Sequence, residues 1–168
     1  SPGVLQASAW IALSEGDTER AFVELEAMAK PDPKGDWRSV AQVLIGAEDK
    51  EKAAALLARL ATPERLGESD QNWIAMSQLA FKLGDKAQAI SHYAEVLAKK
   101  PTDPDATAAL ENLLLEPNHR EEAARALLPA YESVKDHRKM VHALSTIADA
   151  TRDAGEKLAA LKKAGEIH

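Results

Sequence analysis

The amino-acid sequence predicts an all-α protein. Aromatic residues make up only 4% of the chain, whereas Ala and Leu are abundant, a composition typical of closely packed helices rather than of β-sandwiches or barrels. Small residues recur at a regular interval: Ala21, Ala53, Ala89, Ala123 and Ala160. Their separations of 32, 36, 34 and 37 residues indicate one helical hairpin repeated with small changes in its loops. We therefore expect a single solenoid domain over residues 1–168, built from about five hairpins.

The first hairpin is expected over about residues 4–30. Gly16 and Asp17 form its turn, since glycine closes a helix and aspartate begins the next one. Its second helix carries an apolar stripe with helical spacing: Ala21, Leu25 and Met28. Pro31 and Pro33 then break the chain, because proline inside a helix removes a hydrogen bond.

The second hairpin, over about residues 36–62, repeats this arrangement. Trp37 takes the place that Trp73 takes in the third hairpin, so both tryptophans are expected to pack in the core. The apolar stripe of its second helix recurs: Ala53, Leu57 and Leu60. Glu48 stands where the first and third hairpins have glycine, so this turn is expected to differ.

The third hairpin, over about residues 70–100, states the pattern most fully. A helix from Trp73 to Leu83 is stopped by Gly84, which we expect in the left-handed conformation. The second helix carries the longest stripe: Ala89, Ile90, Tyr93, Val96 and Leu97. Pro101 ends it.

The fourth hairpin is expected over about residues 104–134. Its first helix, over 105–115, is short, and Asp103 or Asp105 is expected to cap it. Pro129 lies inside the second helix and predicts a kink or a division there. A competing register pairs the second helix of this hairpin with the helix that follows it. In this register, residues recur at the spacing that the repeat pattern expects: Leu127, Tyr131, Asp136, Met140 and Leu144. The repeat register after about residue 118 therefore stays open.

The fifth hairpin, over about residues 138–168, ends in an apolar stripe formed by Leu161, Ala164 and Ile167. No further helix follows to cover it, so we expect end-to-end self-association at high concentration. Because Ser1 is not an initiator methionine, the natural chain is expected to be longer.

The third hairpin carries a family resemblance through six residues: Trp73, Met76, Gly84, Ala89, Tyr93 and Pro101. At these positions the chain resembles the tetratricopeptide repeat, a helical hairpin of about 34 residues, although Ser77 and Ala80 replace the usual Gly and Tyr. The resemblance covers nearly the whole chain. It implies a right-handed superhelix whose first helices line a concave groove, and a protein-interaction scaffold, which the loose, Ala-rich repeats suggest is bacterial.

Enzymatic chemistry is not expected from this sequence. The chain has no cysteine, and none of its five histidines stands in a metal-binding or nucleophile motif: His92, His119, His137, His142 and His168. We therefore expect no cofactor, no metal and no catalytic residue. A net charge of −6 argues against nucleic acid as a partner.

No apolar run is long enough to cross a membrane, and no signal segment opens the chain. The compartment therefore stays open between the cytoplasm and a bacterial periplasm.

The resemblance places the partner-binding residues on the first helices, which face the groove. The candidates are mostly polar: Gln6, Trp10, Arg38, Gln42, Gln78, Lys82, Asn112, Asp149 and Arg152. Some family members grip a peptide carboxylate with several cations and asparagines, but here Ile74, Gln78 and Ala108 stand at such places, so chaperone tails are disfavoured.

We expect a non-catalytic scaffold that binds a partner peptide or helix in the groove, as part of a bacterial assembly or secretion complex. One alternative is a regulatory or targeting domain of an enzyme whose catalytic part lies outside this chain. Another is a self-associating structural array.

Overall fold

The computed structural model describes residues 2–167 and, of Pro2, the backbone alone. Ser1 and His168, at the ends of the predicted domain, lie outside the described residues. Every regular element in the described part is an α-helix, which confirms the predicted all-α class. The chain divides into two compact units, Ser1–Ala89 and Ile90–His168, with the boundary inside helix α7 (Lys86–Lys99).

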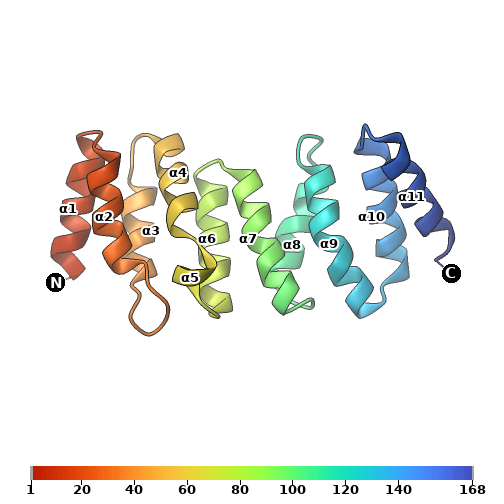
Figure 1. Cartoon of the computed structure of the whole chain (residues 1–168), viewed down its shortest axis with the longest axis horizontal. Coiled ribbons are helices and arrows are strands. Elements are labelled where there is room, and N and C mark those ends of the chain that lie inside the picture. Colours follow the sequence, from red (N-terminus) through yellow and green to blue (C-terminus); the bar gives the residue numbers. More distant parts are fainter. Residues whose placement is uncertain (1, 168) are drawn as a thin grey trace. The chain divides into compact units, whose positions relative to one another are not determined.

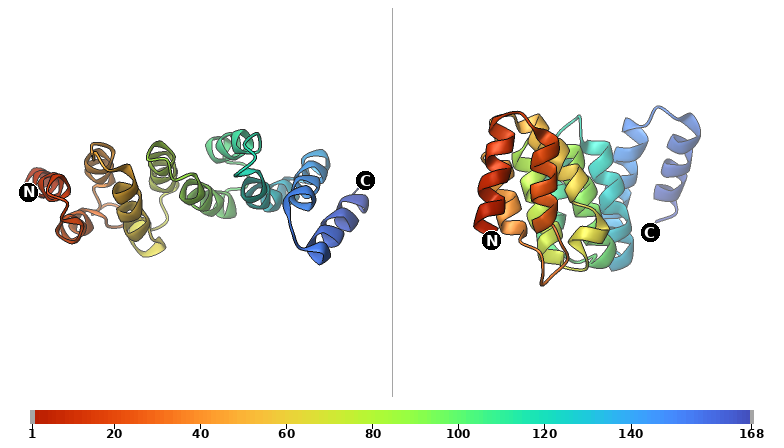
Figure 2. Two further views of the ribbon diagram at one scale, coloured as in Figure 1. Left: turned by 90° about the horizontal axis from the view of Figure 1, so that it is seen from above. Right: turned by 60° about the vertical axis from the view of Figure 1, so that its left-hand side comes forward.

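The first unit consists of two layers of helices. Its helices are α1 (Pro2–Ser14), α2 (Thr18–Met28), α3 (Trp37–Ile45), α4 (Lys50–Leu60), the short α5 (Pro63–Leu66) and α6 (Asp70–Lys82). Helices α1, α3 and α6 pack side by side in one layer, and α2 and α4 form the other (Figures 1 and 2). The first helices therefore share one face, as the repeat pattern predicts.

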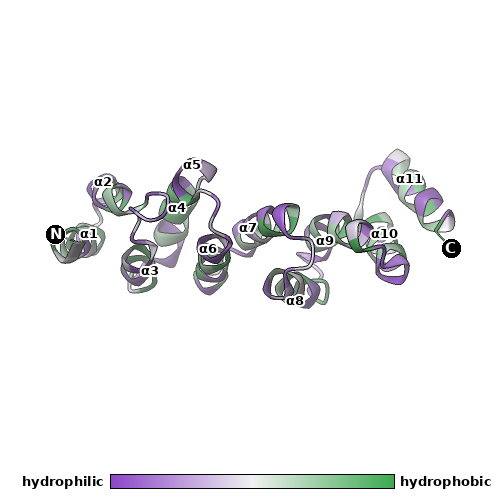
Figure 3. Cartoon of the chain, turned by 90° about the horizontal axis from the view of Figure 1, so that it is seen from below, coloured by the Kyte–Doolittle hydropathy of each residue, from purple (hydrophilic) through white to green (hydrophobic). Residues whose placement is uncertain are grey.

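The second unit contains α8 (Pro104–Leu113), α9 (Arg120–Val134), α10 (His137–Ala150) and α11 (Ala154–Gly165). Each helix packs against the next one along the chain. In both units each helix carries apolar as well as polar residues (Figure 3), as expected for helices buried on one side only.

The repeated alanines lie in the core, as predicted. Ala21, Ala53, Ala89 and Ala123 are fully buried, and Ala160 is 6% exposed. A small side chain at these places lets neighbouring helices approach closely, so the period of about 34 residues reflects packing.

Aspartates begin most of the helices. A carboxylate oxygen accepts a hydrogen bond from the backbone N–H three residues further on at Asp17, Asp36, Asp49, Asp85, Asp103, Asp136 and Asp153. This interaction satisfies a donor that the helix itself leaves free. Of the two candidates for the cap of α8, Asp103 is the one that forms this bond.

The turns of the first and third hairpins share one geometry. Gly16 and Gly84 adopt positive φ angles of 77° and 85°, and the following Asp17 and Asp85 N–H groups donate to carbonyls five residues back, over 2.8 and 2.9 Å. The left-handed conformation predicted for Gly84 is therefore confirmed. The connection between α3 and α4 is longer, over residues 46–49, so Glu48 does not need that conformation.

The α9–α10 turn has the same geometry without glycine. Lys135 has a φ of 56°, and the Asp136 N–H donates to the Tyr131 carbonyl over 3.0 Å. This hydrogen bond is the one that closes the turns at Gly16 and Gly84. The turn therefore favours the competing register, which centres a hairpin on Asp136. The hairpin bounds in the second unit stay a prediction.

Pro129 does not divide α9, contrary to one of the two predicted outcomes. The helix runs uninterrupted from Arg120 to Val134. Proline removes a single backbone donor, and the buried side chains on both sides of it, Leu127, Ala130 and Tyr131, keep the helix packed.

Candidate partner-binding face

Six of the nine predicted groove residues lie on the first-helix layer of the first unit. They form three pairs, each four residues apart on its helix: Gln6 and Trp10 on α1, Arg38 and Gln42 on α3, and Gln78 and Lys82 on α6. Residues four apart share one side of a helix. Gln6 is half-buried and the other five are exposed. We call these six residues the first-helix face.

A hollow of about 400 Å³ lies between α1 and α3. Its walls are mainly apolar, with Ala7, Trp10, Ile11 and Val43 among the lining residues. At its edge the Gln6 side-chain amide donates to Gln42 Oε1 over 2.8 Å. An amide pair of this kind retains further donors and acceptors for a partner backbone.

A second hollow, of about 530 Å³, lies between α3 and α6 and shares Gln42 with the first. Two cations line it, Arg38 and Lys82, together with Gln78, and the apolar side chain of Ile45. No salt bridge or hydrogen bond pairs Arg38 or Lys82 with another side chain within residues 2–167. These charges are therefore available to an acidic partner group.

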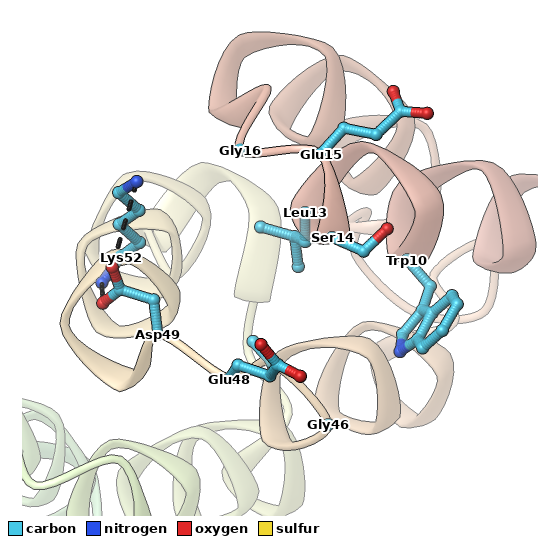
Figure 4. Close-up of a pocket in the computed structure, with 10 residues that line it drawn as sticks. Trp10, Leu13, Ser14, Glu15, Gly16, Gly46, Glu48, Asp49 and Lys52 are labelled. Carbon is cyan, nitrogen blue, oxygen red and sulfur yellow. Dashed lines mark hydrogen bonds and ion pairs between the residues drawn. The ribbon is translucent and has the colours of Figure 1, made fainter.

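A third hollow, of about 480 Å³, lies at the turn end of the first two hairpins and shares Trp10 with the α1–α3 hollow (Figure 4). Its lining comes from the end of α1 and from the connection to α4, and includes Glu15, Glu48 and Asp49. The three hollows thus follow one another across α1, α3 and α6, joined by Trp10 and Gln42.

The three remaining candidates lie in the second unit. Asn112 on α8 and Asp149 on α10 are exposed. Arg152 does not lie on a first helix, because α10 ends at Ala150 and Thr151 turns to an extended conformation. None of the three lines the hollow of about 330 Å³ beside α8 and α9.

That hollow in the second unit contains a hydrogen-bonded network. Glu111 Oε1 accepts from the Tyr131 hydroxyl and from Lys139 Nζ, both over 2.8 Å. Burial, and then the Glu111 carboxylate, raise the pKa of Tyr131 above its ordinary range. The phenol is therefore held neutral, and the network connects three helices rather than activating a nucleophile.

The burial predicted for Trp37 and Trp73 is confirmed, and the structure leaves Trp10 exposed. Trp37 and Trp73 are 4% and 2% exposed and pack in the core, whereas Trp10 is 53% exposed. Two apolar residues that were not predicted for the face, Ile11 and Ile45, are each 43% exposed and line its hollows. Their sequence signal is weak, because an isolated isoleucine in a helix is expected in the core.

No metal or membrane chemistry is evident in the described part of the chain. It holds no group of three or more His, Asp or Glu side chains placed to bind a metal ion. Likewise, no helix within residues 2–167 is long and apolar enough to cross a membrane.

A family model described as tetratricopeptide repeat matches residues 11–163. The match begins near the end of α1, after Gln6 and Trp10, includes α3 and α6, and ends in α11. Comparisons with curated proteins and with solved structures gave no significant match.

Proposed function

The chain belongs to the tetratricopeptide repeat family, a family of protein-interaction scaffolds, and we propose that it binds a protein partner through the first-helix face of its first unit. The partner segment lies across α1, α3 and α6 and fills the hollows between them. The role that we propose for this face is binding without catalysis, because its polar groups are amides and cations, which bind and orient a partner.

The observation that carries the proposal is the pair of uncompensated cations beside an apolar hollow. Arg38 and Lys82 line the α3–α6 hollow together with Gln42 and Gln78. The guanidinium of Arg38 is suited to a forked pair of hydrogen bonds with a partner carboxylate. The glutamine amides are suited to an extended backbone, which presents donors and acceptors in turn.

Packing supports a binding role for the first-helix layer and a packing role for the second-helix layer. The second-helix stripes are buried at Ala21, Leu25, Ala53 and Leu57, so these side chains cannot reach a partner. Five of the six residues of the first-helix face are exposed and can change without disturbing the core. A bacterial assembly or secretion complex remains our proposal for the setting.

The test uses peptides selected from a random displayed library with the parent chain as the target. Their affinities are compared for the parent, for a variant with Arg38→Ala, Gln42→Ala and Gln78→Ala, and for a control. The control carries Val23→Ala, Glu51→Ala and Glu64→Ala, three exposed positions on α2, α4 and α5.

We expect the face variant to bind about tenfold more weakly, or about 1.4 kcal/mol, and the control to bind like the parent. Both variants are expected to melt within a few degrees of the parent, because exposed substitutions alter stability by only about 0.5 kcal/mol each. If the folded face variant binds like the parent, the first-helix face is not the site.

A further inference from the structure

The hollow at the turn end of the first two hairpins has an unusual wall. Trp10 leaves 53% of its surface exposed, although an indole usually gains more from burial. Its ring nitrogen lies beside Gly46, since a Cβ built on that glycine would lie 3.8 Å from Trp10 Nε1. The exposed indole therefore forms one side of a hollow of about 480 Å³.

Glu48 is the uncompensated charge of this hollow. Glu15 is paired with Arg20 over 3.1 Å, and its side chain points away from the other residues in Figure 4. Asp49 accepts from the Lys52 N–H over 3.1 Å and lies 3.9 Å from Lys52 Nζ. Glu48 has no hydrogen bond or ion pair with any described residue, and it lies between Asp49 and Trp10 in the same view.

Two helix ends add negative potential at this place. Helix α1 ends at Ser14 and α3 ends at Ile45, and both ends border the hollow. The last carbonyls of a helix carry partial negative charge and favour cations. The chain itself illustrates this preference, because Lys50 Nζ donates to the Ile45 carbonyl over 2.6 Å.

We propose that this hollow binds an arginine side chain of the partner segment. A guanidinium stacks on an exposed indole, donates in a forked pair to a carboxylate such as that of Glu48, and retains donors for helix-end carbonyls. A lysine ammonium is a compact, strongly hydrated charge and satisfies fewer of these contacts. The inference rests on the proposed function, because the arginine belongs to the segment on the first-helix face.

The proposal predicts the order of charged and apolar residues along the partner segment. Trp10 joins the Glu48 hollow to the apolar α1–α3 hollow, and Gln42 joins that hollow to the one containing Arg38 and Lys82. A complementary segment therefore carries arginine at one end, apolar residues in the middle and a carboxylate at the other end. This order also fixes the direction in which the segment lies.

The probe is N-acetyl-arginine methylamide, titrated into the ¹⁵N-labelled chain and followed by NMR. The chain has three tryptophans, and the indole N–H groups of Trp37 and Trp73 are internal controls because they are buried and hydrogen-bonded to backbone carbonyls. We expect a saturable shift of the Trp10 indole signal with a dissociation constant on the order of 1 mM, a free energy of about 4 kcal/mol. The two control signals stay in place.

Three comparisons test the chemistry. The citrulline derivative has the shape of arginine without its charge, and we expect no saturable shift with it. Glu48→Gln weakens arginine binding by about fivefold or more, whereas Glu51→Gln, an exposed substitution on the adjoining helix α4, leaves it unchanged. N-acetyl-lysine methylamide is expected to bind more weakly than the arginine derivative, because it satisfies fewer of these contacts. Equal binding of the citrulline derivative, equal binding of the lysine derivative, or an unchanged affinity in Glu48→Gln would each overturn the assignment.

This titration separates the two proposals. Because Trp10 also lines the α1–α3 hollow, the effect of Glu48→Gln is what assigns binding of the arginine derivative to the Glu48 hollow. If it fails to shift Trp10 while the displayed peptides still depend on the first-helix face, the arginine assignment falls and the proposed function stands. Peptides selected on the parent, but not on Glu48→Gln, are expected to be enriched in arginine.

Discussion

The indole N–H of Trp37 donates a hydrogen bond to the backbone carbonyl of Lys30 over 2.9 Å and so ties the start of α3 to the end of the first hairpin. Trp73 makes the equivalent bond to the Gly67 carbonyl, also over 2.9 Å. Each tryptophan therefore has two roles, since its ring fills the core and its N–H holds the connection between hairpins.

Gly35 is expected to be essential to the first of these connections. A Cβ built at this position would lie 1.9 Å from Lys30 O, the oxygen that accepts the Trp37 bond. Gly35→Ala must therefore displace that carbonyl, and we expect a loss of about 3 kcal/mol in the free energy of unfolding, measured by urea titration. The control is Gly165→Ala, where no atom lies within 4 Å of the new Cβ. Equal stability of the two variants would contradict this reading of the loop.

Ala89 tests the close packing of the repeated alanines. It is fully buried, whereas Ala87 on the same helix is exposed. Ala89→Glu places an unpaired carboxylate in a space sized for a methyl group, so we expect a loss of about 3 kcal/mol or more. Ala87→Glu is expected to melt within a few degrees of the parent. Thermal unfolding followed by circular dichroism measures both.

We expect the free energy of unfolding to fall at alkaline pH, because the fold raises the pKa values of both tyrosines. Burial is the largest cause that raises the pKa of Tyr93, followed by Asp105, and burial and Glu111 raise that of Tyr131. Both groups ionise more readily in the unfolded chain, at the ordinary pKa of 10.0. Their contribution to stability is therefore complete below pH 10 and is lost as the pH rises towards the folded pKa values.

Just above pH 10 we expect the native chain to show clearly less phenolate absorbance than the chain in guanidinium, whose tyrosines ionise around the ordinary pKa of 10.0. Tyr131→Phe removes the hydrogen bond to Glu111 and is expected to cost about 1 kcal/mol at neutral pH. An ordinary titration of both tyrosines in the native chain would show that they are more exposed than the structure indicates.

The predicted self-association concerns α11. Leu158 and Leu161 are 69% and 47% exposed, whereas Ile167 is half-buried. If association occurs through this end, a variant with Leu158→Lys and Leu161→Lys has a lower average mass at high concentration than the parent, as measured by sedimentation equilibrium. Leu115→Lys, at a position 79% exposed in the α8–α9 connection, is the control. Equal masses at every concentration would place no interface on α11.

The candidate site was predictable in part. The resemblance to the tetratricopeptide repeat placed the candidates on first helices, and six of the nine lie on α1, α3 and α6. The Glu48 hollow was not predicted, because it is formed by the ends of two helices that are distant in sequence. From the sequence, Glu48 is a departure from a glycine turn, and its lack of an ion-pair partner depends on where Lys52 and Arg20 direct their side chains.

The sequence by itself determined the helical class, the packing period and the core positions of Trp37 and Trp73, because caps and apolar stripes act within one hairpin and the alanine spacing repeats from one hairpin to the next. Tertiary structure alone decided that α9 runs through Pro129, that Lys135 takes a left-handed turn, and that Gly35 adjoins the Lys30 carbonyl. At Pro129 and Lys135 a local preference costs a few kcal/mol at most, and the burial of neighbouring side chains outweighs it. At Gly35 the absence of a side chain permits an approach that only the folded connection brings about.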